Sequence, residues 1–560
     1  MKNNSKNRNN SRIMLAVCIS FIITLGWLCL AMFSKPLYAN VDNFTIAVVT
    51  NGLFGEDGYT YYLHPWLCKY LNVISKVLTS ADVYTLLMHI LLFNAFWILY
   101  YFIIKGKYSI KSKVCLILII LSSALAINIW SNNYTIQAAF FAMTGSIVLM
   151  KNSKEKNRWL YIIGLFFICI GFMWRIQGAL LSVPFVLLDI VVHFIKEKKK
   201  LRNYIWYIVI PVCCILTLVV AQKVVNNSPK YKDGIEYSIY RTKVEDFPVE
   251  SWDYISTKTD ILQSEYEAAV YWTLLDTDVI NTELFKKISD VASRNAFSYS
   301  IAGISGALIE MIRCIVTYRN WTLLIGGIII CSLYFLIRKR YSWRLILESI
   351  LGILGAGIIL LYFTIRGRAI SHVWISVMLI TEMLHIEIIA REIEGDDLQK
   401  ENQDFMIKMG TICCIAILWI IARSNWNVPQ FAVNARKNNA LEFEQKCDDN
   451  ALYLWGGWHK NISWTYMGIG KLPTKKFIQH NMAVGDWTYG QTYFREYLEE
   501  IETENPAKAL LIREQTYYVS EDYEELLLYL QEHYGKDIAV QKIGEIQSIP
   551  VWKFVKAWRS

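Results

Sequence analysis

The segment IMLAVCISFIITLGWLCLAMF, residues 13–33, decides the fold class of this chain. It is uncharged throughout, and about 20 apolar residues in helical conformation cross a bilayer. Four basic residues precede it in MKNNSKNRNNSR, which is also expected of a secretory signal peptide. The run is long for the apolar part of a signal peptide and further apolar runs follow it, so we interpret it as an uncleaved first membrane helix.

Further apolar runs extend this pattern along the chain. They lie at 82–104, 114–130, 135–150, 159–174, 178–195, 204–222, 321–337, 345–365, 369–390 and 407–422. Of the 560 residues, 54% are hydrophobic and 19% charged, whereas soluble domains average about 25% charged. The sequence therefore predicts an α-helical polytopic membrane protein with about 11 transmembrane helices. It excludes a disordered chain, a collagen and a disulfide scaffold. A weaker run at 296–317 indicates a re-entrant or interfacial helix.

The distribution of Lys and Arg predicts the orientation. Basic clusters occupy alternate gaps between the runs, at 105–113, 151–158, 196–202 and 338–344. The positive-inside rule places these gaps, and the tail at 1–12, in the cytoplasm. The net charge of +9 therefore reflects topology, and we expect no nucleic-acid partner.

This orientation predicts the domains. Residues 13–422 form the transmembrane domain, with two large outer segments that we call the first loop (34–81) and the second loop (223–320). The tail (423–560) is expected to form a small extracytoplasmic α/β C-terminal domain, with an accessory role favoured over a second catalytic unit. Strands are predicted at 451–455, 509–512 and 538–541, and a helix from a Ser520 cap to Gly535. After Pro65, apolar residues at helical spacing predict an amphipathic helix in the membrane interface.

The first loop contains acids that are candidates for catalysis. Asp42 and Asn43 follow the first membrane helix by a few residues, and Glu56 and Asp57 come later. An acid held at the bilayer surface costs free energy unless it is paired or solvated in a cavity. Asp42 is therefore a candidate functional acid, although its spacing alone favours an ordinary solvated loop acid.

Cations on the outer side form the second set of candidates. Arg175 lies in FMWRIQGALL, while Arg366, Arg368 and His372 lie in YFTIRGRAISHVW. The positive-inside rule disfavours arginine there, and arginines present forked donors that suit phosphate. Contact with lipid headgroups is the alternative explanation for these side chains.

The second loop is rich in acids and aromatic residues. Arg241, Asp246, Tyr254 and Trp272 stand out in this segment. Aromatic rings stack on the C–H faces of sugars and acids bind sugar hydroxyls, so this composition suits sugar binding. Tyr and Trp are also common anchors at the membrane interface, and the two interpretations carry equal weight.

Together these features resemble the GT-C glycosyltransferases, which use polyprenyl-phosphate sugars as donors. The stretch DNFTIAVVTNGLFGEDGYTYYLHPWLCKYLNVISKVL (42–78) is similar to a group of Gram-positive multispan proteins described as glycosyltransferases. The segments YSIYRTKVEDFPVESWDY and RGRAISHVW are similar to the same group. The resemblance covers 13–422 and implies a GT-C-like fold in a bacterial cell membrane.

Two positions depart from that group. Asn43 stands where a second acid is expected, and His372 where an arginine is common. If a Mg²⁺ or Mn²⁺ ion needs both acids, Asn43 puts that divalent site in doubt, and Glu56 and Asp57 remain as further second-acid candidates. The metal requirement therefore stays open, and no other cofactor is assigned. His372 would make phosphate binding weaker or pH-dependent.

The resemblance implies an inverting glycosyl transfer. The donor phosphate would bind Arg366 or Arg368, and Arg175, while Asp42 would act as general base towards the acceptor hydroxyl. The acceptor would be an envelope glycan or lipid. Three other functions remain open: a flippase or transporter for a lipid-linked saccharide, a polysaccharide polymerase, and an inactive envelope scaffold. The second to seventh apolar runs contain few ionisable residues, which counts against a transporter.

Overall fold

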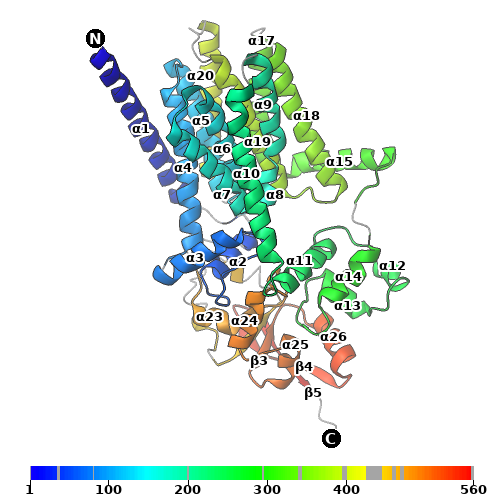
Figure 1. Ribbon diagram of the computed structural model, residues 1–560. Helices are drawn as coiled ribbons and strands as arrows, with labels where there is room; N and C mark the ends of the chain where they lie inside the picture. Colours follow the sequence, from blue (N-terminus) through cyan, green and yellow to red (C-terminus); the bar gives the residue numbers. More distant parts are fainter. Residues whose placement is uncertain are drawn as a thin grey trace.

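The computed structural model shows a helical bundle with a mixed β-sheet at one end (Figure 1). It describes residues 2–34, 38, 40–79, 81–197, 201–292, 296–338, 343–393, 400–423, 444–448, 450–456, 462–463, 465–466 and 472–556. The N-terminus lies at the end of the bundle opposite the sheet (Figure 1). We call the end that carries the sheet the sheet end.

Among the described residues, eight helices are long and apolar enough to cross a membrane. The protein is therefore a helical polytopic membrane protein. The eight comprise α1 (Lys2–Phe33), α4 (Val83–Lys105), α5 (Ile110–Ile129), α10 (Leu201–Asn226), α17 (Gly327–Arg338) with the short α16 (Arg319–Trp321) and π-helix η1 (Thr322–Gly326) before it, α18 (Trp343–Ile365), α19 (Ser371–Ile393) and α20 (Lys400–Ala422). The predicted tail at 1–12 continues α1 as helix from Lys2.

The predicted total of eleven membrane helices is not confirmed. Three predicted runs fall outside the eight helices, although they also form bundle helices, namely α6 (Tyr134–Glu155), α7 (Arg158–Trp174) and α9 (Val183–Glu197). The run predicted at 178–195 is interrupted, because the short α8 (Ile176–Leu180) ends before α9 begins. The weaker run at 296–317 contains α15 (Ile301–Thr317), which lies across the sheet end of the bundle (Figure 1).

The first loop contains two helices. The predicted helix after Pro65 is confirmed as α3 (Pro65–Val77), with Pro65 in its first turn and the His64 side chain accepting from the Trp66 N–H. Its outer face is apolar, with exposed side chains at Trp66, Tyr70, Val73, Ile74 and Val77. The other helix, α2 (Val41–Thr50), was not predicted, and it carries Asp42 in its first turn.

The tail contains a five-stranded sheet of order β2-β1-β3-β5-β4. Its strands are β1 (Leu452–Trp455), β2 (Asn481–Ala483), β3 (Thr516–Val519), β4 (Ile538–Ile546) and β5 (Ile549–Lys556). β1 pairs in parallel with both β2 and β3, whereas β5 pairs antiparallel with β3 and β4. Its helices are α23 (Lys475–His480), α24 (Thr492–Glu500), α25 (Pro506–Ile512) and α26 (Glu524–Tyr534).

Two of the three predicted strands are present, as β1 and β4. The strand predicted at 509–512 is wrong, because these residues belong to α25. The Asn505 side chain accepts from the N–H groups of Ala507 and Lys508, and Pro506 fills the first helical position, so the local sequence starts a helix. The predicted helix after Ser520 begins later, at Glu524, and ends before Gly535 as expected.

The second loop forms a helical layer between the bundle and the sheet (Figure 1). It contains α11 (Lys232–Glu245), α12 (Trp252–Ser256), α13 (Gln263–Val270) and α14 (Thr282–Val291). Buried Asp276 joins this layer to the tail, since it accepts from Asn505 Nδ2 (2.8 Å), Tyr529 (3.1 Å) and Tyr534 (2.5 Å). The tail also contacts the first loop. The carboxylate of Glu496, in the tail, accepts from the backbone N–H groups of Glu56 and Asp57 in the first loop. The three segments predicted to share one side therefore pack together at the sheet end.

Candidate functional site

A cavity of about 510 Å³ lies at the sheet end, where the bundle, both loops and the tail meet. We call it the sheet-end cavity. Six of the candidate residues line it: Asp42, Arg175, Asp246, Trp272, Arg368 and His372. Its other lining residues are Val41, Tyr62, Tyr134, Tyr271, Ile370, Trp455, Gly456, Gly485 and Trp487. Residues more than 400 positions apart in the chain therefore share one polar, aromatic site.

Asp42 enters the cavity from the first turn of α2. Its Oδ2 accepts from Asn40 Nδ2 at 2.7 Å and from the Tyr134 hydroxyl at 3.3 Å. The first turn of a helix favours negative charge. Both donors also stabilise the carboxylate form, so Asp42 is held as an oriented anion.

Arg175 follows directly after α7 and contacts two neighbouring aromatic rings. Its guanidinium carbon is 4.7 Å from the ring centre of Tyr62 and 4.6 Å from that of Tyr134. Its Nη1 donates to the Tyr134 hydroxyl, which in turn donates to Asp42. Its Nε is buried and has no hydrogen-bond partner among the described residues. Arg175 thus orients the Asp42 carboxylate through Tyr134 and keeps a donor for a further acceptor.

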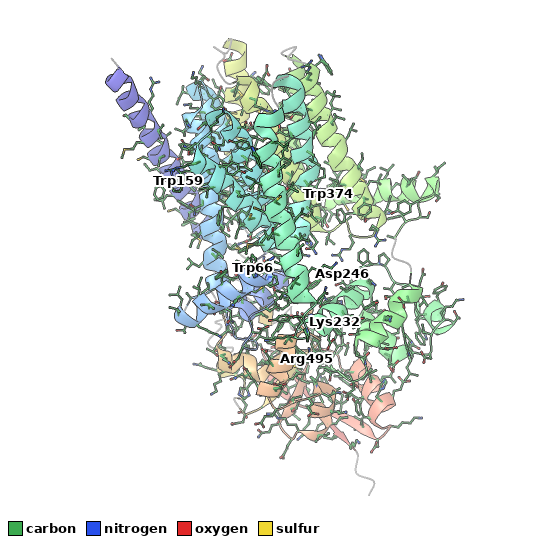
Figure 2. All side chains as sticks on the ribbon, viewed as in Figure 1. Trp66, Trp159, Lys232, Asp246, Trp374 and Arg495 are labelled. Carbon is green, nitrogen blue, oxygen red and sulfur yellow. The ribbon has the colours of Figure 1, made fainter. Side chains whose placement is uncertain are left out.

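A second cation lies at the turn between α18 and α19. Arg368 Nη1 is 2.7 Å from the Asp246 carboxylate, and Arg366 and Arg368 both lie near the ring of Phe247. Gly367 between them has φ +71°, a conformation that glycine adopts at little cost. Asp246, labelled in Figure 2, lies between the bundle and the helices of the second loop. Arg368 therefore reaches the cavity, whereas Arg366 is not among the residues that line it.

Trp272 occupies a strained position on the cavity wall. Its φ of 65° lies in the left-handed region, which a bulky residue rarely adopts. The guanidinium carbon of Arg241 lies 5.1 Å from its ring centre, and Arg241 is paired with Glu245. Burial raises the pKa of Glu245 to about 8, although Arg241 opposes this rise. A Cβ at Gly485 would lie 1.7 Å from the Trp272 carbonyl oxygen, so only glycine fits there without a shift.

The tail supplies one wall of the cavity. Trp455 and Gly456 lie at the carboxyl end of β1, and Gly485 and Trp487 follow β2. β1 is flanked by β2 on one side and β3 on the other, so the strand order switches direction at β1. Ligands of open α/β sheets bind outside the carboxyl ends of strands at such a switch point. This placement favours a direct part for the tail at the site over the accessory role expected from sequence.

Aromatic contacts connect this wall to the bundle. The ring centres of Trp487 and Tyr62 lie 4.6 Å apart, and Tyr62 also contacts Arg175. Burial raises the pKa of the Tyr62 hydroxyl, which therefore remains protonated. Asp486, next to Trp487, accepts from the Thr45 hydroxyl of α2 at 3.3 Å. The first loop and the tail thus hold each other in position around the cavity.

Besides Arg366 and Arg241, which do not line the cavity, four further candidate residues lie away from it. Asn43 is buried, where it donates to the Asn132 carbonyl (2.6 Å) and accepts from the Tyr84 hydroxyl (3.0 Å). Asp57 pairs with Lys230 at 3.0 Å, and Glu56 contacts the tail through its backbone. Tyr254 is 45% exposed on α12.

Sequence reasoning missed Tyr62, Tyr134, Tyr271 and the four tail residues as site residues. The signal for the aromatic ones was the abundance of aromatic residues in segments predicted to lie outside the membrane, and Gly456 and Gly485 gave no such signal.

The donor set near Asp42 does not fit a metal held by adjoining acids. Asn43 faces away into the protein and is fully hydrogen-bonded there. Asp246, the other acid that lines the cavity, is already paired with Arg368. Among the described residues, no group of three or more His, Cys, Asp or Glu side chains lies close enough to share a metal ion. We therefore derive no chemical step through a metal.

These features define a class: a helical polytopic membrane protein with a polar, aromatic cavity beneath a packed helical and α/β cap. In comparisons with known proteins, the chain matches no family model and no curated protein. Any function must therefore be argued from the site.

Proposed function

We propose that the protein is a membrane glycosyltransferase that moves a sugar from a polyprenyl-phosphate donor to an envelope glycan or lipid. One observation carries the proposal: Asp42, Arg175 and Arg368 line the same aromatic cavity at the sheet end of the bundle. A carboxylate base, cations for a phosphate and rings for a sugar are what such a reaction requires. The GT-C resemblance of the sequence supports the same function.

In the proposed reaction, Asp42 accepts the proton of the acceptor hydroxyl. The hydroxyl oxygen attacks the anomeric carbon of the donor sugar from the face opposite the phosphate. The bond between that carbon and the phosphate oxygen breaks, and polyprenyl phosphate leaves with the electron pair. A single displacement inverts the anomeric configuration.

The chain's own residues support each part of this step. Tyr134 and Asn40 hold Asp42 in one orientation. Arg175 supplies positive charge to the cavity for the leaving phosphate, and Arg368, which is paired with Asp246, lies on the same cavity. His372, at the start of α19, lines the same cavity. Fixed donors aimed at the developing charge stabilise the transition state.

The proposed location follows from the same geometry. With the N-terminus in the cytoplasm of a bacterial cell, the sheet end faces outward. The lipid tail of the donor would lie in the outer leaflet, while the sugar and the acceptor would enter the sheet-end cavity. Trp487 and Trp272 would provide stacking surfaces for the sugar rings.

The test compares two carboxyl-to-amide variants in a deletion strain. Asp42→Asn removes the proposed base, whereas Asp260→Asn changes an acid on the surface of the second loop whose side chain is 79% exposed. We expect the wild type and Asp260→Asn to restore one envelope sugar that the deletion strain lacks, and Asp42→Asn to fail at equal expression. Restoration by Asp42→Asn would remove Asp42 from the mechanism and overturn the proposal.

A second candidate function is transport of a lipid-linked saccharide, favoured by a buried charge network near the end of the bundle opposite the sheet. Arg391 of α19 lies 2.9 Å from Asp189 and 2.7 Å from Glu348. Ionisable groups inside a membrane protein are expensive and commonly mark transport pathways. If the protein is such a transporter, the Asp42→Asn variant should still carry the saccharide across vesicle membranes. Variants of Arg391, Asp189 or Glu348 should not.

A further inference from the structure

A second acid site lies inside the bundle on α19, about three helical turns after His372, which lines the sheet-end cavity. Glu382 is the twelfth of the 23 residues of α19 and is fully buried. Its Oε1 accepts from the Ser123 hydroxyl of α5 at 2.6 Å. Its Oε2 is also buried and has no hydrogen-bond partner among the described residues. The carboxyl group therefore has one neutral partner and one oxygen without any.

The surroundings of Glu382 disfavour a carboxylate anion. An unpaired charge in an apolar interior costs several kcal/mol, and it is tolerated when a cation or several donors compensate it. The other buried acids of this helix region have such cations, since Glu387 pairs with Lys151 at 2.9 Å and Glu348 with Arg391 at 2.7 Å. Glu382 pairs with no cation among the residues that the structure describes, so its neutral, protonated form is favoured.

A small cavity beside Glu382 connects it to a charged pair. The cavity measures about 50 Å³ and is lined by apolar side chains together with Tyr108, Ser123, Glu382, Lys151 and Glu387. About 10–15 Å³ of such space holds one water molecule, so this cavity has room for about three. Lys151 is 19% exposed, so the pair at this part of the cavity reaches the surface of the bundle.

The titratable groups around Glu382 come from several helices. His385 follows one turn later on α19, where its Nδ1 contacts the Thr381 carbonyl. Cys413 of α20 lies within electrostatic range. Lys151 of α6 and Glu387 of α19 form an ion pair with each other. Among the described residues, no cation forms an ion pair with Glu382.

From this arrangement we propose that Glu382 is a proton-binding site within the membrane, which exchanges its proton through the small cavity with the Lys151–Glu387 pair. The ligand is a proton, and the step is a transfer between the Glu382 carboxyl group and water in the cavity. Its function is independent of glycosyl transfer, because neither Asp42 nor an arginine of the sheet-end cavity takes part.

Infrared spectroscopy of the purified full-length protein in detergent tests this proposal. A protonated carboxylic acid in apolar surroundings has a C=O stretch separate from that of carboxylates, and the band shifts in D₂O when the proton exchanges. We expect the wild type and Glu310→Gln, a change at an exposed ion pair on α15, to show this band. Because buried Glu245 also has a raised pKa and contributes to this region, the band of Glu382 is read from the difference between the wild-type and Glu382→Gln spectra. A difference spectrum without a protonated-carboxyl band, or no band in the wild type, would overturn the proposal.

The route of exchange is tested by filling the cavity. Ala390 lines it and is 4% exposed, so Ala390→Leu should slow the D₂O shift at least several-fold. Gly355→Leu, at a position where an added Cβ meets nothing within 4 Å, is the matched control and should not slow it. Equal rates in all three proteins would contradict exchange through the cavity.

A third measurement needs no variant and so does not depend on the folding of Glu382→Gln. A hydrophobic carbodiimide adds to protonated carboxyl groups in apolar sites, and peptide mapping by mass spectrometry locates the adduct. We expect the adduct on Glu382 of the folded wild type. Its absence there would count against a protonated Glu382, whatever the outcome of the glycan test.

Discussion

Two acids of this molecule occupy opposite environments. Asp42 lies at the sheet end, where it accepts from Asn40 and Tyr134 and shares a large cavity with two arginines. Glu382 lies halfway along α19, where it has a single bond from Ser123 beside a cavity one tenth that size. The same functional group is therefore stabilised as an anion in one place and as a neutral acid in the other.

The difference teaches that the partners of an acid, more than its identity, decide its chemistry. Hydrogen-bond donors and nearby cations favour the carboxylate, whereas an apolar interior favours the protonated form. The first state suits a general base and the second suits a proton store. Changes to the buried charges of the bundle and to residues of the sheet end should therefore have different effects on stability.

The largest effect is expected in the interior, from Arg391→Met. The change leaves Asp189 and Glu348 buried without their cation. Loss of one partner of a buried ion pair costs about 3–5 kcal/mol. We expect the thermal unfolding midpoint in detergent to fall sharply and the yield of folded protein to drop.

The matched control is Arg313→Met, which breaks an ion pair to Glu310 whose arginine side chain is 73% exposed. Surface pairs contribute about 0–1 kcal/mol, so the midpoint should hardly move. Equal losses in the two variants would show that the interior network is no more sensitive than the surface.

A smaller effect is expected at the sheet end, from Gly485→Ala. The added Cβ would lie 1.7 Å from the Trp272 carbonyl oxygen, so the backbone of Trp272 must move. Overpacking of this kind lowers the free energy of unfolding by about 1–3 kcal/mol, and we expect a loss at the upper end of that range here. Binding of a sugar should weaken as well, because Trp272 lines the cavity.

Gly544→Ala serves as the control, since an added Cβ there meets nothing within 4 Å. Calorimetric unfolding, followed by titration with the sugar that the glycan test identifies, measures both quantities. Unchanged stability and binding in Gly485→Ala would contradict the close approach of Trp272 to the tail.

The smallest effect concerns the pH dependence of the contact between the tail and the first loop. Burial raises the pKa of Asp486 from 3.8 to about 6. The folded state then holds this proton more tightly than the unfolded state, so its stabilising contribution is complete below pH 4 and is lost as the pH rises through about 6. At about 1.4 kcal/mol per unit, the loss amounts to about 2–3 kcal/mol.

Unfolding midpoints at pH 4.5 and pH 7.5 measure this effect. The wild type should lose more stability between these values than Asp486→Asn, which cannot ionise and keeps the acceptor for the Thr488 N–H. A wild type and a variant with identical pH dependence would show that Asp486 is not buried as described.

Local patterns predicted much of the fold. The apolar runs specified the bundle, and Pro65 marked the start of α3. Local rules failed where two signals competed, as at 509–512, whose apolar residues indicated a strand while the Asn505-Pro506 cap started a helix. β5 was missed for another reason: it pairs with β3 and β4, and the local sequence does not show which strands will lie beside it.

The candidate site was partly predictable. Asp42, Arg175 and Arg368 were recognised because charges at membrane boundaries are costly and therefore conspicuous. Trp455 and Trp487 could not be recognised, because they are ordinary aromatic residues until the sheet brings them to the cavity. Asn43 and Glu56 were conspicuous in sequence, and the fold turns them away.

The amino-acid sequence was sufficient to specify a multispan helical protein, because apolar length and charge placement act locally against the bilayer. It also specified which side chains are chemically capable. Tertiary packing alone determined that residues from α2, the α18–α19 turn and the carboxyl ends of β1 and β2 meet in one cavity. It also determined that Glu382 forms no ion pair within the described part of the chain. The physical reason is that electrostatic environment depends on distances in space, and the chain sets these distances only once it has folded.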